Sequence, residues 1–208
     1  MAISTADLLD PAHTALVLQE VQQGVVGPNA ALPALEAAAA DVGLVENCAR
    51  LATAARAVDV PVFHCIAQHR TDGLGGNRNA RLFAGVKKSA VKLTPGTSAV
   101  APPPEVGVDE RDVVLARYHG LGPMSGTQLD PMLRNLEVRT IVAVGVSVNL
   151  GITNLCFDAV NRGYQVVLVT DAVAGFPADY ARDVIEHTLT LITTPVATDD
   201  VVARWRVR

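Results

Sequence analysis

The sequence predicts a three-layer α/β/α domain built on a mostly parallel sheet. Short apolar runs alternate along the chain with longer segments of helical periodicity. The predicted core is aliphatic, because hydrophobic residues make up 50% of the 208 residues and aromatic residues only 4%. Strands that alternate with helices are joined by right-handed crossovers, which make the strands parallel and cover both faces of the sheet. We expect a single domain over residues 1–208, since this length suits one hydrophobic core.

The strands are predicted from short apolar runs bounded by polar or turn residues. They cover residues 14–18, 60–66, 112–116, 140–146 and 165–170. Helical periodicity predicts helices at residues 32–58 with a break near Gly43, and at 127–136, 149–162 and 179–192, before a short segment at 193–198. The stretch 68–104 is rich in Gly, Asn, Arg and Pro. Because it is longer than an ordinary connection, we expect a lid or an oligomer contact there.

Composition excludes several classes of function. The net charge is −4 and Lys and Arg form no dense block, which argues against a nucleic-acid partner. No apolar run approaches the roughly 20 residues of a membrane span, and the first residues lack a secretory pattern, so we expect a cytoplasmic protein. The cysteines, Cys48, Cys65 and Cys156, form no C-x-x-C pair that would suggest a zinc site. No G-x-G-x-x-G sequence stands at a strand-to-helix turn, so a nucleotide site is not indicated and we expect no cofactor. The expected partner is a small-molecule substrate bound at the strand ends.

Ligands of parallel sheets bind at the carboxyl ends of the strands. In this chain that rule selects residues 19–23, 64–69, 117–124 and 147–151. These four segments hold the candidate catalytic and substrate-binding residues.

Three stretches carry a resemblance to a known family. They are ALVLQEVQQGVV at residues 15–26, LARYHGLGPMSGTQLDPMLRNL at 115–136 and VGVSVNLGITNLCFDAVNRGYQVVLVTDAVAG at 144–175. In order and spacing, the chain resembles the isochorismatase-like hydrolases, which include isochorismatases, nicotinamidases and related amidases. The resemblance implies an isochorismatase-like, Rossmann-like topology and a homo-oligomer, a dimer or larger.

Most members of that family carry a triad: an Asp after the first strand, a Lys after the third, and a nucleophilic Cys in the turn after the fourth. The resemblance assigns Glu20, Arg117 and Gly151 to these places. Gly151 removes the nucleophile that covalent amide hydrolysis needs. Arg117 keeps the positive charge but cannot give up a proton, and Glu20 keeps a carboxylate on a longer arm.

The glycine favours one reaction. Isochorismatases of this family resemble the chain in carrying Gly where the amidases carry Cys, and they hydrolyse a vinyl ether: a carboxylic acid protonates the enol-ether carbon, and water attacks the resulting oxocarbenium ion. The resemblance therefore implies a hydrolase with Glu20 as general acid. Burial would raise the pKa of Glu20, whereas a nearby Arg117 would lower it.

Two alternatives stay open. One is a catalytically inert family member that binds a small acid or a protein partner, because all three triad residues differ. The other is an amidase with a relocated nucleophile, Cys156. Cys156 lies seven residues beyond Asn149, about two helical turns or roughly 10 Å deeper, so we interpret it as a core residue.

Further site residues follow from position. His119 is a candidate acid, base or hydrogen-bond donor, or else an ordinary loop residue. A metal site at His64 and His69 is disfavoured, because Ala67 stands where nicotinamidase-type members have an Asp. Asn149 suits a helix N-cap, with neighbouring N–H groups free to face a ligand. The residues expected to bind substrate are Gln22, His64, Ser147, Asn149 and Gly151.

Overall fold

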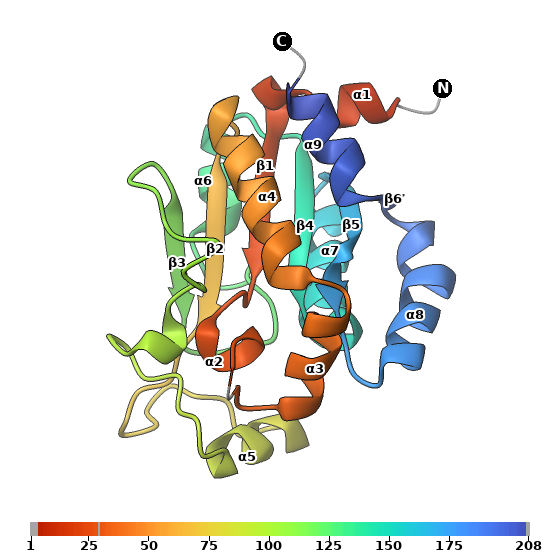
Figure 1. Ribbon diagram of the computed structural model, residues 1–208. Coiled ribbons are helices and arrows are strands. Elements are labelled where there is room, and N and C mark those ends of the chain that lie inside the picture. The colour runs from red at the N-terminus through yellow and green to blue at the C-terminus, as the bar shows by residue number, and fades with distance from the viewer. Residues whose placement is uncertain (1–3, 29, 207–208) are drawn as a thin grey trace.

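The computed structural model describes residues 4–28 and 30–206, and its centre is a parallel sheet (Figure 1). The strands are β1 (Thr14–Gln19), β2 (Val62–Ala67), β3 (Val113–Arg117), β4 (Thr140–Val146), β5 (Gln165–Ala174) and β6 (Thr194–Val196). They are ordered β3-β2-β1-β4-β5-β6, and every neighbouring pair is parallel. The order reverses at β1, which lies between β2 and β4. The crevice beyond its carboxyl end is therefore the topological switch point at which ligands of such sheets bind.

Helices cover both faces of this sheet, which confirms the predicted three layers. In Figure 1, α4 and α9 cross the near face, and α6 and α7 lie behind the strands. Alternate residues of β1 supply the two cores: Leu16 and Leu18 join one hydrophobic cluster, and Ala15 and Val17 join the other. The helices of the first cluster are α1 (Thr5–Leu8), α2 (Gln23–Val26), α3 (Pro33–Asp41), α4 (Leu44–Ala57) and α9 (Thr198–Arg206). Those of the second are α6 (Leu129–Asn135), α7 (Thr153–Asn161) and α8 (Ala178–His187).

The predicted break at Gly43 is confirmed. Gly43 has a φ of 63° and separates α3 from α4. A left-handed residue ends one helix and lets the next begin in another direction, and glycine adopts it without steric cost. From there α4 packs one stripe on the sheet, formed by the buried residues Leu44, Cys48, Leu51, Ala52 and Ala55.

Several elements differ from the sequence-based expectation. Strand β5 continues to Ala174, four residues beyond its predicted end. Strand β3 is only partly buried because it forms one edge of the sheet. Helix α9 was not predicted, although its Trp205 is buried and donates a hydrogen bond from Nε1 to the carbonyl oxygen of Leu9 at 3.1 Å. Its apolar residues are too few to show a clear helical period, because Asp and Arg alternate with them.

The stretch 68–104 is not the uniform loop that its composition suggests. It contains α5 (Arg81–Lys88), which buries no residue, and a short 3₁₀ turn at Ser98–Val100 that packs against α2 (Gln23–Val26). Leu93 and Val100 are buried. This stretch lies at the carboxyl ends of the strands, with α5 below α2 and α3 in Figure 1. Its role as a lid or an oligomer contact stays a prediction.

The remaining short turns are 3₁₀ helices at Pro11–His13 and Leu189–Leu191. None of the helices among the described residues is both long and apolar enough to span a membrane.

Candidate active site

Glu20 and Arg117 meet at the carboxyl ends of β1 and β3, although 97 residues separate them. A guanidinium nitrogen of Arg117, Nη2, donates a hydrogen bond to Oε1 of Glu20 and also reaches the carbonyl oxygen of Leu121 at 3.4 Å. The Arg117 side chain is 7% exposed and that of Glu20 is 21% exposed. The carboxyl group is thus held by a buried cation and remains open to solvent on one side.

The protonation of Glu20 is set by two opposing effects. Burial raises its pKa, while the charge of Arg117 and the hydrogen bond from it lower the pKa. Burial is the larger effect, so the pKa lies above its ordinary value of 4.5. A carboxyl group of this kind keeps its proton to a higher pH than a solvated glutamate, as a general acid requires.

The backbone at Glu20 is unusual. Its φ is 52°, in the left-handed region that few residues other than glycine adopt. Its N–H donates to the carbonyl oxygen of Cys65 at 2.9 Å, and its own carbonyl accepts the N–H of Gln22 at 2.9 Å. Such strained conformations cluster at functional sites, where the surrounding hydrogen bonds enforce them.

Gly151 lies against the side chain of Gln19, the last residue of β1. A Cβ added to Gly151 would be 2.9 Å from the carbonyl oxygen of Val146 and 3.0 Å from Nε2 of Gln19. Gln19 is fully buried, and its Nε2 donates to Oε1 of Glu20 at 3.0 Å. The amide of Gln19 therefore occupies the space beside Gly151 and touches the candidate acid. Sequence reasoning placed Gln19 in a ligand-facing group but assigned it no role.

The turn after β4 has a close backbone approach and an irregular helix start. At Gly145 (φ 110°) an added Cβ would be 2.1 Å from the carbonyl oxygen of Gln19, so only glycine fits there. The peptide bond between Val146 and Ser147 is cis. A π-helical turn follows at Val148–Ile152, and the carbonyl oxygen of Ser147 accepts the N–H of Ile152 at 3.0 Å.

This turn corrects the expectation for Asn149. The expected single helix from residue 149 is instead the π turn followed by α7, and the residue in the N-cap position is Ser147, which makes no side-chain cap. Asn149 lies inside the turn and donates from Nδ2 to the carbonyl oxygen of Phe176 at 3.2 Å. Its Oδ1 is buried, and none of the residues that the structure describes donates a hydrogen bond to it. The helical segment begins at Val148, so the capping position is Ser147 and not the Asn149 that the sequence suggests.

The family follows from comparison with known proteins. The isochorismatase domain model matches residues 14–200. The chain belongs to the isochorismatase family. It is 34% identical over 88 residues to the isochorismatase family protein YwoC of Bacillus subtilis (strain 168), a match that spans 42% of this chain and 43% of that protein.

Solved structures agree with the isochorismatase fold. An isochorismatase family protein from Burkholderia thailandensis is similar with a TM-score of 0.75 and 28% identity, over 95% of this chain and 97% of that one. A cysteine hydrolase from Pseudomonas syringae pv. phaseolicola 1448A has a TM-score of 0.82 and 23% identity, over 95% and 94% of the two chains. The predicted α/β fold and family are thereby confirmed.

Two of the expected substrate-binding residues are engaged elsewhere in this isochorismatase-family chain. Gln22 is fully buried and bridges backbone: Nε2 donates to the carbonyl oxygens of Ala67 and Val100 at 2.9 and 3.2 Å, and Oε1 accepts the N–H of Ala67 at 2.8 Å. These bonds tie the turn after β1 to the end of β2 and to the stretch 68–104. Gln22 therefore stabilises the backbone around the candidate site. Its buried amide does not face a substrate.

His64 also belongs to a buried network. Its Nε2 is 2.9 Å from Oδ2 of Asp112, and that same oxygen accepts a hydrogen bond from Arg56 of α4 at 2.6 Å. Burial lowers the pKa of His64, and this effect exceeds the opposing influence of Asp112. With 1% of its side chain exposed, His64 joins β2 to α4 and to the start of β3 and does not line an open surface.

The two loop histidines lie in different surroundings. His119 is exposed and packs over Gly126, where an added Cβ would be 2.7 Å from its ring. Among the described residues, the hydrogen-bond partners of the Glu20 side chain are Gln19 and Arg117 and not His119. His69 is half-buried, and its pKa is lowered first by burial and then by the charge of Arg117. His69 therefore lies within electrostatic reach of Arg117, whereas the sequence suggested for it only a disfavoured metal site.

The cysteines lie in the core. Cys156 is fully buried in α7, as its spacing predicts, and burial raises the pKa of its thiol to about 12. Cys65, beneath Glu20 and Arg117, is also buried with a pKa of about 12. Neither forms a thiolate near neutral pH. In the described part of the chain, no three His, Cys, Asp or Glu side chains are grouped closely enough to hold a metal ion.

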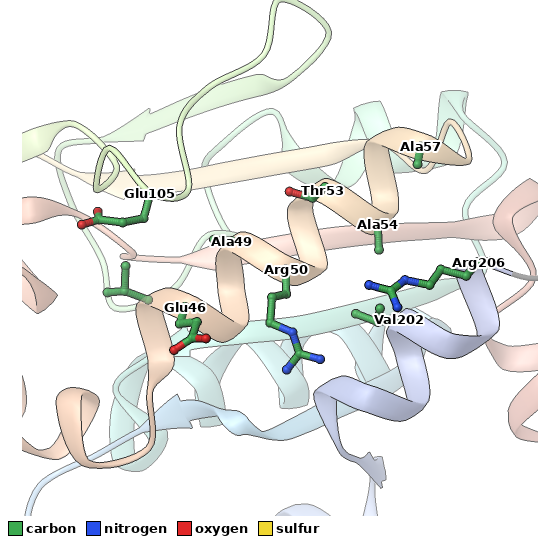
Figure 2. Close-up of a pocket in the computed structure, with 10 residues that line it drawn as sticks. Glu46, Ala49, Arg50, Thr53, Ala54, Ala57, Glu105, Val202 and Arg206 are labelled. Atoms are coloured by element: carbon green, nitrogen blue, oxygen red, sulfur yellow. The ribbon is translucent and has the colours of Figure 1, made fainter.

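A separate groove lies on the outer face between α4 and α9 (Figure 2). Its floor is made of small side chains, including Ala49 and Ala54, and charged groups such as Glu46, Arg50 and Arg206 line it. Arg50 is ion-paired with Asp199 of α9. None of the predicted catalytic residues lines this groove, so it is distinct from the candidate site.

Proposed function

We propose that the chain is an isochorismatase-family hydrolase that cleaves a vinyl ether of the isochorismate type without a cysteine nucleophile. Glu20 is the general acid, and Arg117 orients its carboxyl group. The observation that carries the proposal is the partly exposed carboxyl of Glu20, whose pKa is raised by burial although Arg117 is in direct contact.

The reaction needs only an acid and water. The carboxyl group of Glu20 transfers its proton to the terminal carbon of the enol ether, which leaves an oxocarbenium ion and a carboxylate. Water adds to this cation and loses a proton, which restores the acid. The resulting hemiketal collapses to a ketone and an alcohol. Arg117 stabilises the carboxylate that forms in the first step, because opposite charges in contact favour the ionised state.

The surroundings of Gly151 support a reaction without a covalent intermediate. The backbone of Val146 and the amide of Gln19 fill the space that a side chain at residue 151 would need. The buried, high-pKa thiols of Cys65 and Cys156 argue against a relocated nucleophile. Of the two alternatives, the amidase is therefore the less well supported.

The inert binder remains a second candidate. Glu20 is already paired with Arg117, and Gln19 fills the position beside Gly151, as would suit a site that has lost its chemistry. On that hypothesis a small acid binds, displaces Glu20 from Arg117 and is released unchanged. The same residues take part in both functions, so turnover must be measured.

The test is hydrolysis of isochorismate beside a panel of amides, for the native protein and three variants. Glu20→Gln removes the acid, and we expect its vinyl-ether turnover to fall by about 10²–10⁴-fold. Cys156→Ala and Glu46→Gln should retain turnover, the latter as a matched control at an exposed glutamate.

Each other outcome has a definite meaning. Amide hydrolysis lost in Cys156→Ala would refute the proposal in favour of the amidase. Unchanged isochorismate turnover in Glu20→Gln would remove Glu20 from the mechanism. Calorimetric binding of isochorismate without turnover would establish the inert binder.

A further inference from the structure

Gln19 has features of a residue retained for a purpose other than stability. It is the last residue of β1, its side chain is fully buried, and it pairs in register with Cys65 on one side and Gly145 on the other. Its Nε2 donates to Oε1 of Glu20 at 3.0 Å. Its Oε1, however, is buried and has no hydrogen-bond partner in the described part of the chain. An unpaired carbonyl in the interior is costly, so an apolar side chain of similar size would be the more stable choice.

The orientation of the amide follows from its neighbour. With Nε2 toward Glu20, an N–H group faces a carboxyl oxygen, whereas the flipped amide would place two acceptor oxygens together whenever Glu20 is ionised. The absence of a side chain at Gly151 makes room for this amide, since an added Cβ would be 3.0 Å from Nε2. Gln19 and Gly151 are therefore sterically matched.

We propose that Gln19 is a positioning residue for the acid: lodged beside Gly151, its amide holds Oε1 of Glu20 together with Arg117, so that the reactive proton resides on Oε2. The inference rests on the proposed function. It deepens that function by assigning the proton-donating atom and by naming a residue that acts through Glu20.

The assignment of the proton follows from the number of donors. Oε1 accepts one hydrogen bond from Gln19 and one from Arg117, which occupies both of its lone-pair directions. Among the described residues, none donates to Oε2. The side chain of Glu20 is partly exposed, so a substrate has access to this free oxygen. A carboxyl group fixed through one oxygen presents the other in a constant direction, which is the geometry that efficient proton transfer needs.

The experiment compares Gln19→Leu and Gln19→Met with Gln23→Leu. Gln23 is the control, because it is a glutamine four residues beyond Gln19 that donates to the carbonyl oxygen of Pro102 and not to Glu20. The carboxyl carbon of Glu20 is titrated by ¹³C NMR, with its signal assigned by its loss in Glu20→Gln. This readout needs no substrate, so it judges the role of Gln19 even if isochorismate proves to be the wrong substrate.

Removing the Gln19 donor should raise the pKa of Glu20 by about one unit, because a hydrogen bond to the ionised form is lost. On a hydrolysed substrate, kcat should fall about tenfold with KM little changed, since only the orientation of the acid is affected. The thermal midpoint should stay the same or rise, because the unpaired buried carbonyl is removed. Gln23→Leu should leave the Glu20 titration unchanged.

Two results would overturn the inference. If both Gln19 variants melt at a lower temperature while the titration of Glu20 is unchanged, Gln19 is a structural residue. If Glu20 titrates lower after either substitution, the amide does not donate to the carboxylate. A shifted titration without isochorismate turnover would retain the role of Gln19 and refute only the proposed substrate.

Discussion

Replacing Gly151 with cysteine would put a cysteine at the position to which the resemblance assigns the nucleophile of the family, and we predict that it destabilises this protein without creating an amidase. The new Cβ would be 2.9 Å from the carbonyl oxygen of Val146 and 3.0 Å from Nε2 of Gln19. Ordinary contacts of a Cβ lie beyond 3.4 Å. Val146 contributes a backbone atom of a central strand, which cannot move without disturbing β4.

The cost follows from these contacts. Overpacking of a filled core destabilises by about 1–3 kcal/mol. For a chain of this size, each kcal/mol lowers the thermal midpoint by about 2–4 °C. In a Gln19→Ala background one of the two clashes is absent, so the cost of Gly151→Cys should be smaller there, by at least about 0.5 kcal/mol.

Urea unfolding of the two single variants and the double variant measures this coupling, and the amide panel tests for new activity. Gly85→Cys makes the same chemical change on α5, where an added Cβ meets nothing within 4 Å, and it should be neutral or slightly stabilising. The steric reasoning would be refuted if Gly151→Cys were as stable as the native protein, or if its cost were the same with and without Gln19.

Three further predictions concern charged groups. Asp112→Ala should cost about 3–5 kcal/mol in urea unfolding, because it leaves the cation of Arg56 without its carboxylate; an effect below about 1 kcal/mol would argue against the network. Burial holds the pKa of His64 below 6.5, so in acid the unfolded chain binds the extra proton. Stability should therefore fall as the pH drops below about 6.5 toward the folded-state pKa, and His64→Gln should flatten that slope. Arg117→Met should raise the pKa of Glu20 further and so move the alkaline limb of the pH–rate profile to higher pH by about one unit or more. If the limb does not move, Glu20 is not the acid.

The homo-oligomer, a dimer or larger, stays a prediction that sedimentation measurements would test. So does the role of the stretch 68–104. A monomer at micromolar concentration would leave the lid as the remaining interpretation of that stretch.

The sequence by itself determined the layers of this isochorismatase-family protein and the place of its candidate site. Periodicity identified β1 to β5 and the break at Gly43 but not the short strand β6, and the rule for parallel sheets predicted the candidate site at the carboxyl ends of the strands. The same rule predicts that Glu20 and Arg117 lie at one edge of the sheet, and in the structure they form an ion pair there. These features depend on local sequence or on strand topology, so the sequence alone is enough to predict them.

Only the tertiary structure decided what the individual side chains do. Gln22 and His64 looked like ligand-facing groups, but backbone amides and Asp112 engage them. Asn149 looked like a helix cap until the π turn displaced it. Gln19 gained a candidate role only because Gly151, far along the chain, leaves room for its amide. Hydrogen-bond partners and free volume depend on residues distant in sequence, and a linear pattern carries no information about them.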